Sequence, residues 1–133
     1  MTDRVNFPAG WESVRRFLAR YIDSVELLEV LLLARAAPDK RWSTSEVARA
    51  LTLTLESANL RLRQLAGRGL LRADLEAKTF VYSPESDELD TTIDAVAEAY
   101  AVRRTSVIGL IFQGPSDSVR GFADAFRLRE EEE

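Results

Sequence analysis

Hydrophobic residues recur at helical spacing in the first third of the chain. Between residues 10 and 22, positions 11, 14, 17, 18 and 21 fall on one apolar stripe, and charged side chains lie off it. This pattern predicts an amphipathic helix, which either packs on the body of the protein or forms a dimerisation element. Residues 24–37 are apolar almost all round, which predicts a helix buried on more than one side. Asp23 and Glu26 have capping-box spacing at its start, and Pro38 ends it.

Residues 43–66 predict two helices joined by a tight turn. Ser43 and Glu46 have the spacing of a capping box, in which the serine and glutamate side chains accept hydrogen bonds from each other's backbone N–H groups. Thr52 and Thr54 lie in the turn, and both are candidate N-caps of the second helix. The second helix is expected over residues 55–66.

A short β-hairpin is predicted next. Gly67 or Gly69 ends the preceding helix, because glycine adopts the left-handed C-cap conformation without strain. The stretches 70–74 and 79–82 have the composition of two strands, and residues 75–78 form the turn between them. The element order is therefore helix, turn, helix and hairpin.

Residues 86–129 carry two more apolar stripes. One long helix is expected from Ser86 to residue 112, although composition alone would also allow a buried strand over 107–112. A last helix is expected after Gly114-Pro115. Because these stripes need another surface to cover them, we predict a homodimer built mainly from residues 86–129, with residues 10–22 as a further candidate element. The side chains assigned to this interface are Leu89, Ile93, Val96, Tyr100, Val107, Phe122 and Phe126.

Composition narrows the chemistry. The chain has 133 residues with no cysteine and no histidine, which excludes disulfides, thiol redox sensing and histidine general bases. It also lacks a nucleophile–base pair, a glycine-rich phosphate loop and a metal-ligand cluster. We therefore expect no enzyme activity, no cofactor and no metal. Residues 1–9 have no apolar signal core and no stretch is long enough for a membrane span, so the cytoplasm is the expected location.

Residues 43–83 resemble the winged helix-turn-helix domain of bacterial transcriptional regulators, such as the MarR, ArsR and PadR groups. The stretches that carry the resemblance are STSEVARAL, ESANLRLRQLAGRGLL and the hairpin ending in FVYS. The resemblance implies a mainly α fold with a small β-hairpin (α+β), with additional N- and C-terminal helices. It also implies that Trp42 belongs to the core, in a slot that often pairs with the wing as a third strand.

The expected organisation has four parts. Residues 1–9 form a mobile arm, and residues 10–83 form the winged domain with its leading helix. Residues 86–129 form the helical dimerisation region, and residues 130–133 form an acidic tail.

Charge is segregated along the chain. The formal net charge is −4, but residues 35–83 hold nine Lys or Arg against five Asp or Glu. Residues 84–133 hold five arginines against twelve acids. A nucleic-acid binder needs a local basic face rather than a basic whole. The positive charge lies on the helix-turn-helix and hairpin, which favours DNA binding over ordinary surface charge.

The second helix of the motif presents side chains suited to base edges. Arginine pairs with guanine, and asparagine or glutamine pairs with adenine. Hydroxyls and N–H groups at the helix start can bind phosphate, and the hairpin tip can reach the DNA backbone. Glu56 and Leu60 on the outward face count against this interpretation. The assigned DNA-binding residues are Thr52, Thr54, Ser57, Asn59, Arg61, Arg63, Gln64, Arg72 and Lys78.

Two functions follow as hypotheses. The first is a homodimeric transcriptional regulator that binds double-stranded DNA through a recognition helix, at about residues 55–66, and a wing, at about residues 70–83. The alternative is a winged-helix adaptor that binds a protein partner in a regulatory complex without contacting DNA. Salt-sensitive duplex binding discriminates them, because phosphate contacts release counterions.

Overall fold

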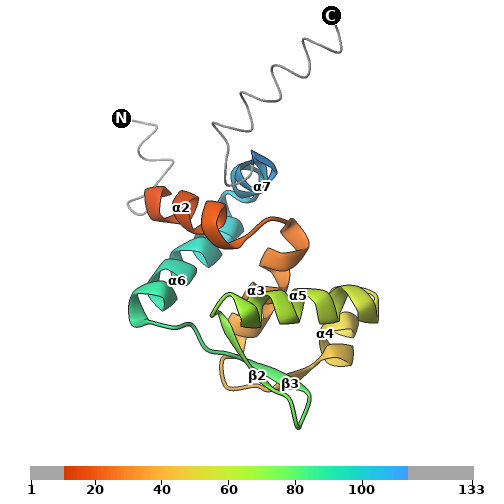
Figure 1. Cartoon of the computed structure of the whole chain (residues 1–133). Coiled ribbons are helices and arrows are strands. Elements are labelled where there is room, and N and C mark those ends of the chain that lie inside the picture. Colours follow the sequence, from red (N-terminus) through yellow and green to blue (C-terminus); the bar gives the residue numbers. More distant parts are fainter. Residues whose placement is uncertain (1–10, 114–133) are drawn as a thin grey trace, which may run out of the picture. The chain divides into compact units, whose positions relative to one another are not determined.

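The computed structural model describes residues 11–113, and within that range the chain is mainly helical with one small sheet (Figure 1). It divides into two compact units. One contains residues 24–94, and the other contains, of the described residues, 11–23 and 95–113. The leading helix thus groups with the C-terminal helices, whereas the sequence analysis assigned it to the winged domain.

The unit of residues 24–94 has the element order of a winged helix. Helices α3 (Val25–Ala36), α4 (Thr44–Leu51) and α5 (Leu55–Gly67) contact one another. Strands β1 (Trp42–Ser43), β2 (Leu71–Asp74) and β3 (Thr79–Tyr82) form an antiparallel sheet in the order β1-β3-β2. This confirms the predicted fold class, the hairpin and the third strand that contains Trp42.

The core of this unit is built from the predicted apolar faces. Helix α3 is buried along Leu27, Leu28, Val30 and Leu31, as expected of a helix that is apolar almost all round. Phe80 pairs with Trp42 on one side and with Ala73 on the other, so these three side chains lie on one face of the sheet. Trp42 is buried, as predicted.

One of the two predicted capping boxes is present in the structure. The Ser43–Glu46 capping box is present, with Glu46 N–H donating to Ser43 Oγ at 3.2 Å and Ser43 N–H to Glu46 Oε1 at 3.0 Å. The predicted Asp23–Glu26 box is wrong by one residue. Ser24 caps α3 instead, with its Oγ accepting from Leu27 N–H at 3.0 Å. Serine and aspartate cap equally well, so spacing alone did not distinguish them.

Gly69 marks the sharp change of direction after α5. Its φ is +82°, and a Cβ at this position would lie 2.5 Å from the Cδ atom of Glu85. Gly67 lies in the last turn of α5 and has open space around it. The left-handed glycine expected after the second helix is therefore Gly69.

The other unit contains α2 (Trp11–Tyr21), which contacts α7 (Arg104–Gln113). Val14, Phe17 and Leu18 are buried on the predicted stripe of α2. The single long helix expected from residue 86 is wrong. The structure has α6 (Asp87–Val102) and α7, separated at Arg103. The break falls where two adjacent arginines interrupt the apolar stripe, and α7 confirms helix rather than strand over 107–112.

Most of the side chains assigned to the dimer interface are buried in the single chain, and the interface itself stays a prediction. Ile93, Val96, Tyr100 and Val107 are buried within the single chain, and Leu89 is half-buried. The remaining interface residues, Phe122 and Phe126, lie outside the described residues.

Candidate nucleic-acid interface

Helix α5 begins after a turn that fixes its direction. Thr54 is its N-cap, with Oγ1 accepting from Ser57 N–H at 3.0 Å. Thr52 was the other candidate N-cap of α5, but it does not cap that helix. It ends α4 in the left-handed conformation, at φ 58°, while its backbone N–H donates to the carbonyl oxygen of Ala48. Only one residue can occupy the N-cap, so the two threonines have different roles.

The faces of α5 follow its 3.6-residue repeat. Ala58, Leu62 and Leu65 are buried against the rest of the unit. The 3.6-residue repeat predicts that Leu55 shares the buried face. Leu55 is instead 59% exposed, because it lies in the first turn and lines the second hollow described below. Successive residues advance by about 100°, so the side opposite the buried face carries Glu56, Leu60, Arg63 and Gly67, all of them exposed.

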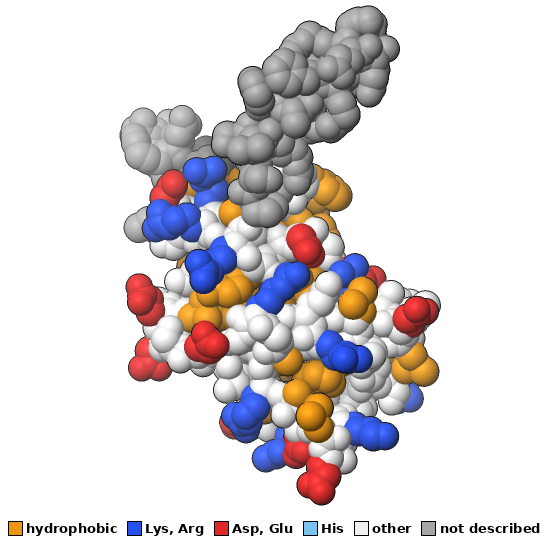
Figure 2. Space-filling view, in the orientation of Figure 1, with side chains coloured by type: hydrophobic (Ala, Val, Ile, Leu, Met, Phe, Trp, Pro, Cys, Tyr) orange, Lys and Arg blue, Asp and Glu red, His pale blue; other side chains and the backbone are white. Residues whose placement is uncertain are grey.

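A groove lies between α5 and the wing, which is the β2–β3 hairpin. It encloses about 500 Å³. A second hollow of about 510 Å³ shares three of its lining residues, Thr44, Asn59 and Lys78. In this region Figure 2 shows hydrophobic side chains at the surface, with basic side chains around them and acidic side chains at the lower end of the view. The groove is lined by Thr44, Asn59, Arg63, Ala66, Ala73, Asp74, Leu75, Lys78 and Phe80.

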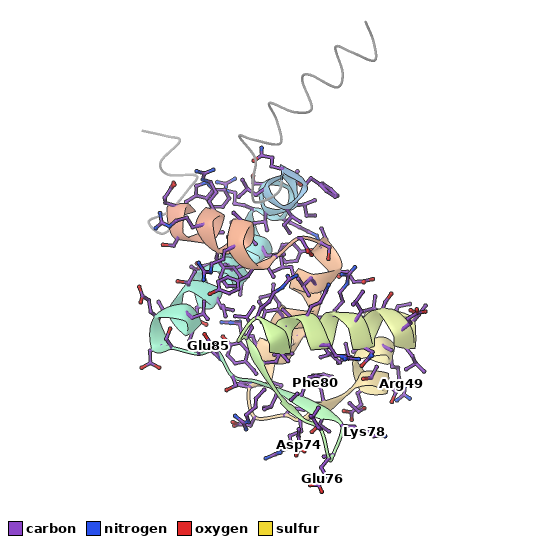
Figure 3. All side chains as sticks on the ribbon, viewed as in Figure 1. Arg49, Asp74, Glu76, Lys78, Phe80 and Glu85 are labelled. Atoms are coloured by element: carbon purple, nitrogen blue, oxygen red, sulfur yellow. The ribbon has the colours of Figure 1, made fainter. Side chains whose placement is uncertain are left out.

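The wing presents its tip in a fixed conformation. Asp74 Oδ1 accepts from the N–H groups of Glu76 and Ala77, each at 3.1 Å, which braces the turn. Lys78 closes the turn in the left-handed region, at φ 58°. Figure 3 shows Glu76 at the tip, Lys78 beside it and Phe80 below α5. Leu75 is 84% exposed.

Three cations near this face lack an ion pair in the part of the chain that the structure describes. Within residues 11–113, Arg63 and Lys78 have no ion-pair partner, and neither does the exposed Arg49 of α4. Asp74 of the wing also lines the groove, where its Oδ1 atom accepts from the turn and its Oδ2 atom lies 3.9 Å from Arg41 Nη1. Cations without an ion-pair partner beside a groove are suited to an anionic ligand.

The predicted site residues separate into two groups. Asn59, Arg63 and Lys78 come together at the groove. Arg61 and Gln64 lie on another side of α5. The Nε atom of Arg61 donates to Glu26 Oε1 at 2.7 Å, and its Nη1 atom donates to Gln64 Oε1 at 3.0 Å. These contacts join α5 to α3.

Arg72, Ser57 and the two threonines are also not brought to the groove. Arg72 alternates with Ala73 along β2, so it faces the opposite side of the sheet, and its Nη1 atom donates to Ser83 Oγ at 3.4 Å. Ser57, Thr52 and Thr54 are absent from the groove lining.

Sequence reasoning missed Arg49, Thr44, Ser45 and the apolar groove floor. Arg49 and Ser45 lie on the exposed side of α4, away from the buried Val47 and Ala48, so helical periodicity could have identified them. The floor could not have been found in this way, because Ala66, Ala73 and Phe80 meet only when α5 and the wing fold together.

A polar network lies at the other end of β3. Tyr82 Oη donates to Asp90 Oδ1 at 2.7 Å, and Arg35 Nε and Nη2 both lie 3.0 Å from Asp94 Oδ1. Burial raises the pKa of Tyr82 above its ordinary value, and the adjacent Asp90 carboxylate adds to the effect. Tyr82 therefore stays protonated as a donor, and the first two turns of α6 are fastened to β3 and α3.

Comparisons with known proteins add little about function. No family model and no curated protein matches the chain. One solved structure, "Possible transcriptional regulator from Methanosarcina mazei Go1", is 17% identical with a TM-score of 0.45, and the match covers 71% of this chain and 82% of that chain. A likeness at this level carries no argument about what the present chain does.

Within residues 11–113, no helix combines the length and apolar character needed to cross a bilayer. No cluster of Asp and Glu there is arranged to hold a metal ion. The groove beside α5 is therefore the candidate functional site.

Proposed function

We propose that the chain is a transcriptional regulator that binds double-stranded DNA, with α5 in the major groove and the wing against the flanking backbone. The observation that carries the proposal is a pair of cations on opposite walls of the groove, Arg63 and Lys78, neither of which has an ion-pair partner within residues 11–113. One comes from the recognition helix and the other from the wing, which are the two elements that a winged helix presents to a duplex.

Each DNA contact is assigned from the position of the side chain and from the groups with which it can form hydrogen bonds. Arg63 lies on the outward side of α5 and pairs with a guanine edge, and Asn59, one turn earlier, pairs with adenine. Lys78 binds phosphate as a point charge, and Arg49 is added on α4, the helix that crosses the DNA backbone in this motif. Arg61 is left out of the contact set because Glu26 and Gln64 hold its guanidinium.

A second function is favoured by a specific observation. Three leucines are exposed on this face: Leu55 and Leu60 on α5, and Leu75 on the wing. Exposed apolar side chains of this size are typical of protein-binding surfaces. The alternative is therefore an adaptor whose groove binds an acidic, partly apolar protein segment.

Fluorescence anisotropy with labelled duplex DNA at several salt concentrations tests the proposal. The full chain should bind, with log K falling linearly as log salt concentration rises. Lys78→Ala should weaken binding to all sequences and reduce the salt slope by about one. Arg63→Ala should cost about 1–3 kcal/mol on the preferred sequence and little on others.

Arg16→Ala is the matched control, because it removes the same charge from an exposed position on α2. If the full chain binds no duplex at low salt, or if the Arg16 variant weakens binding as much as the Arg63 variant, the groove is not the DNA site. The adaptor would then be the function to pursue.

The homodimer is part of the proposal, with a different interface. Since the stripe on α6 is buried within the chain, a second copy would pack on the apolar side chains left exposed, Val102 (68%) and Phe112 (75%). Light scattering of the full chain should give a dimer, and Phe112→Ser should shift it toward monomer. A wild-type monomer at every concentration would remove the dimer while leaving DNA binding open to its own test.

A further inference from the structure

Leu60 occupies the centre of the side of α5 that faces away from the core. It lies one turn after Glu56 and one turn before Arg63, and Gly67 follows on the same line. Leu60 is 47% exposed, and a Cβ added at Gly67 would meet nothing within 4 Å. This line of the helix is therefore uncovered in the described part of the chain.

A recognition helix enters the major groove with this side foremost. Leu60 is the sixth of the 13 residues of α5, within the N-terminal half of the helix, and N-terminal residues of a recognition helix contact base edges. Leucine has no donor or acceptor, so it cannot read a base by hydrogen bonding. The apolar group that the major groove offers is the C5-methyl group of thymine.

We propose that Leu60 is a specificity-determining residue that packs on the C5-methyl group of a thymine, within the DNA site proposed above, and the inference rests on that function. The neighbouring charges fit this placement. Arg63 favours guanine on one side, and Glu56 repels phosphate while accepting from the amino group of cytosine. The target duplex therefore carries a thymine between the base pairs that these two residues read.

The experiment replaces thymine by uracil, which removes only the methyl group. The probe is a short duplex that the full chain selects from a randomised pool, synthesised with each thymine in turn changed to uracil. Burying one methyl group accounts for about a fourfold difference in affinity. One thymine should therefore show about a fourfold loss with the wild type, and thymines outside the footprint should show none.

Two variants assign that loss to Leu60. Leu60→Ala should bind the thymine and uracil duplexes alike, whereas Leu60→Met should keep part of the preference. Leu55→Ala is the matched control, since it removes the same side chain from a 59% exposed position of the same helix and should keep the full preference. Circular dichroism checks that each variant is folded.

The outcomes separate this inference from the proposed function. Salt-sensitive duplex binding with no effect of uracil at any position overturns the role of Leu60 and leaves DNA binding standing. Loss of the preference in Leu55→Ala but not in Leu60→Ala also overturns it. Absence of duplex binding altogether overturns both.

Discussion

Arg61 of α5 donates from Nε to the Glu26 carboxylate of α3 at 2.7 Å, with both side chains largely covered. A guanidinium that points outward on a recognition helix would be a DNA contact. This one is turned toward the protein, where it fixes the position of α5 against α3.

The first prediction concerns this ion pair. Arg61→Ala should lower the free energy of unfolding by about 1–2 kcal/mol, between the values for exposed and buried pairs, because it leaves Glu26 without its partner. Urea denaturation of both single variants and the double variant with Glu26→Ala measures the coupling. The DNA affinity of the folded Arg61 variant should equal that of the wild type. Unchanged stability with lost DNA binding would instead restore Arg61 to the contact set.

A second prediction separates charge from backbone strain at the wing. Lys78 has φ 58°, a conformation that raises the energy of a non-glycine residue by about 1 kcal/mol. Lys78→Gly relieves the strain but gains unfolded-state entropy, so its stability should equal or exceed that of the wild type by up to about 1 kcal/mol. Lys78→Ala keeps the strain. Both variants should lose DNA affinity equally, since both lose the ammonium group. Unequal affinities would mean that wing conformation matters more than charge.

The third prediction contrasts two glycines that are two residues apart. Gly69→Ala should destabilise the protein by about 1–3 kcal/mol, because φ is +82° and the new methyl group would meet the Glu85 side chain. Gly67→Ala should stabilise α5 by about 0.5–1 kcal/mol, since it improves helix propensity in open space. Adding Glu85→Ala to Gly69→Ala should recover only part of the loss, because the backbone strain persists. Thermal unfolding of the four proteins provides the measurement.

The fourth prediction concerns acid. The hydrogen bond from the Ser43 backbone N–H lowers the pKa of Glu46, and Lys40 contributes further. A carboxyl group whose pKa is lower in the folded state stabilises the fold above its unfolded pKa, and this contribution disappears as pH falls through the folded pKa. Glu46→Gln should therefore reduce the loss of stability on acidification, measured by denaturation at neutral pH and at pH values near the carboxyl range. An unchanged acid profile would show that the capping box does not contribute to acid unfolding.

Much of the winged unit follows from local sequence. The Ser43–Glu46 box, the turn at residues 75–78 and the glycine after α5 are short-range signals, and the structure has all three. The N-cap of α3 is Ser24 rather than the predicted Asp23, because both residue types are good caps. The break at Arg103 was missed because no glycine or proline marks it.

The candidate site was less accessible to sequence reasoning. Periodicity places Arg61 near the outward face of α5, but only the position of Glu26, 35 residues away in the sequence, decides where its guanidinium points. The direction of Arg72 likewise depends on strand register. The burial of Val96 and Val107 depends on tertiary packing, so the apolar stripe alone could not show how much of it lies at the surface.

Helix α6 belongs to both units, since the division between them falls at Asp94 and Ala95, inside its 16 residues. Within the unit of residues 24–94, the first part of α6 is held at two points, since Tyr82 donates to Asp90 and Arg35 pairs with Asp94. The consequence is protection from exchange: the backbone amide hydrogens of residues 91–94 should exchange with deuterium as slowly as those of β3, because both belong to one packed unit.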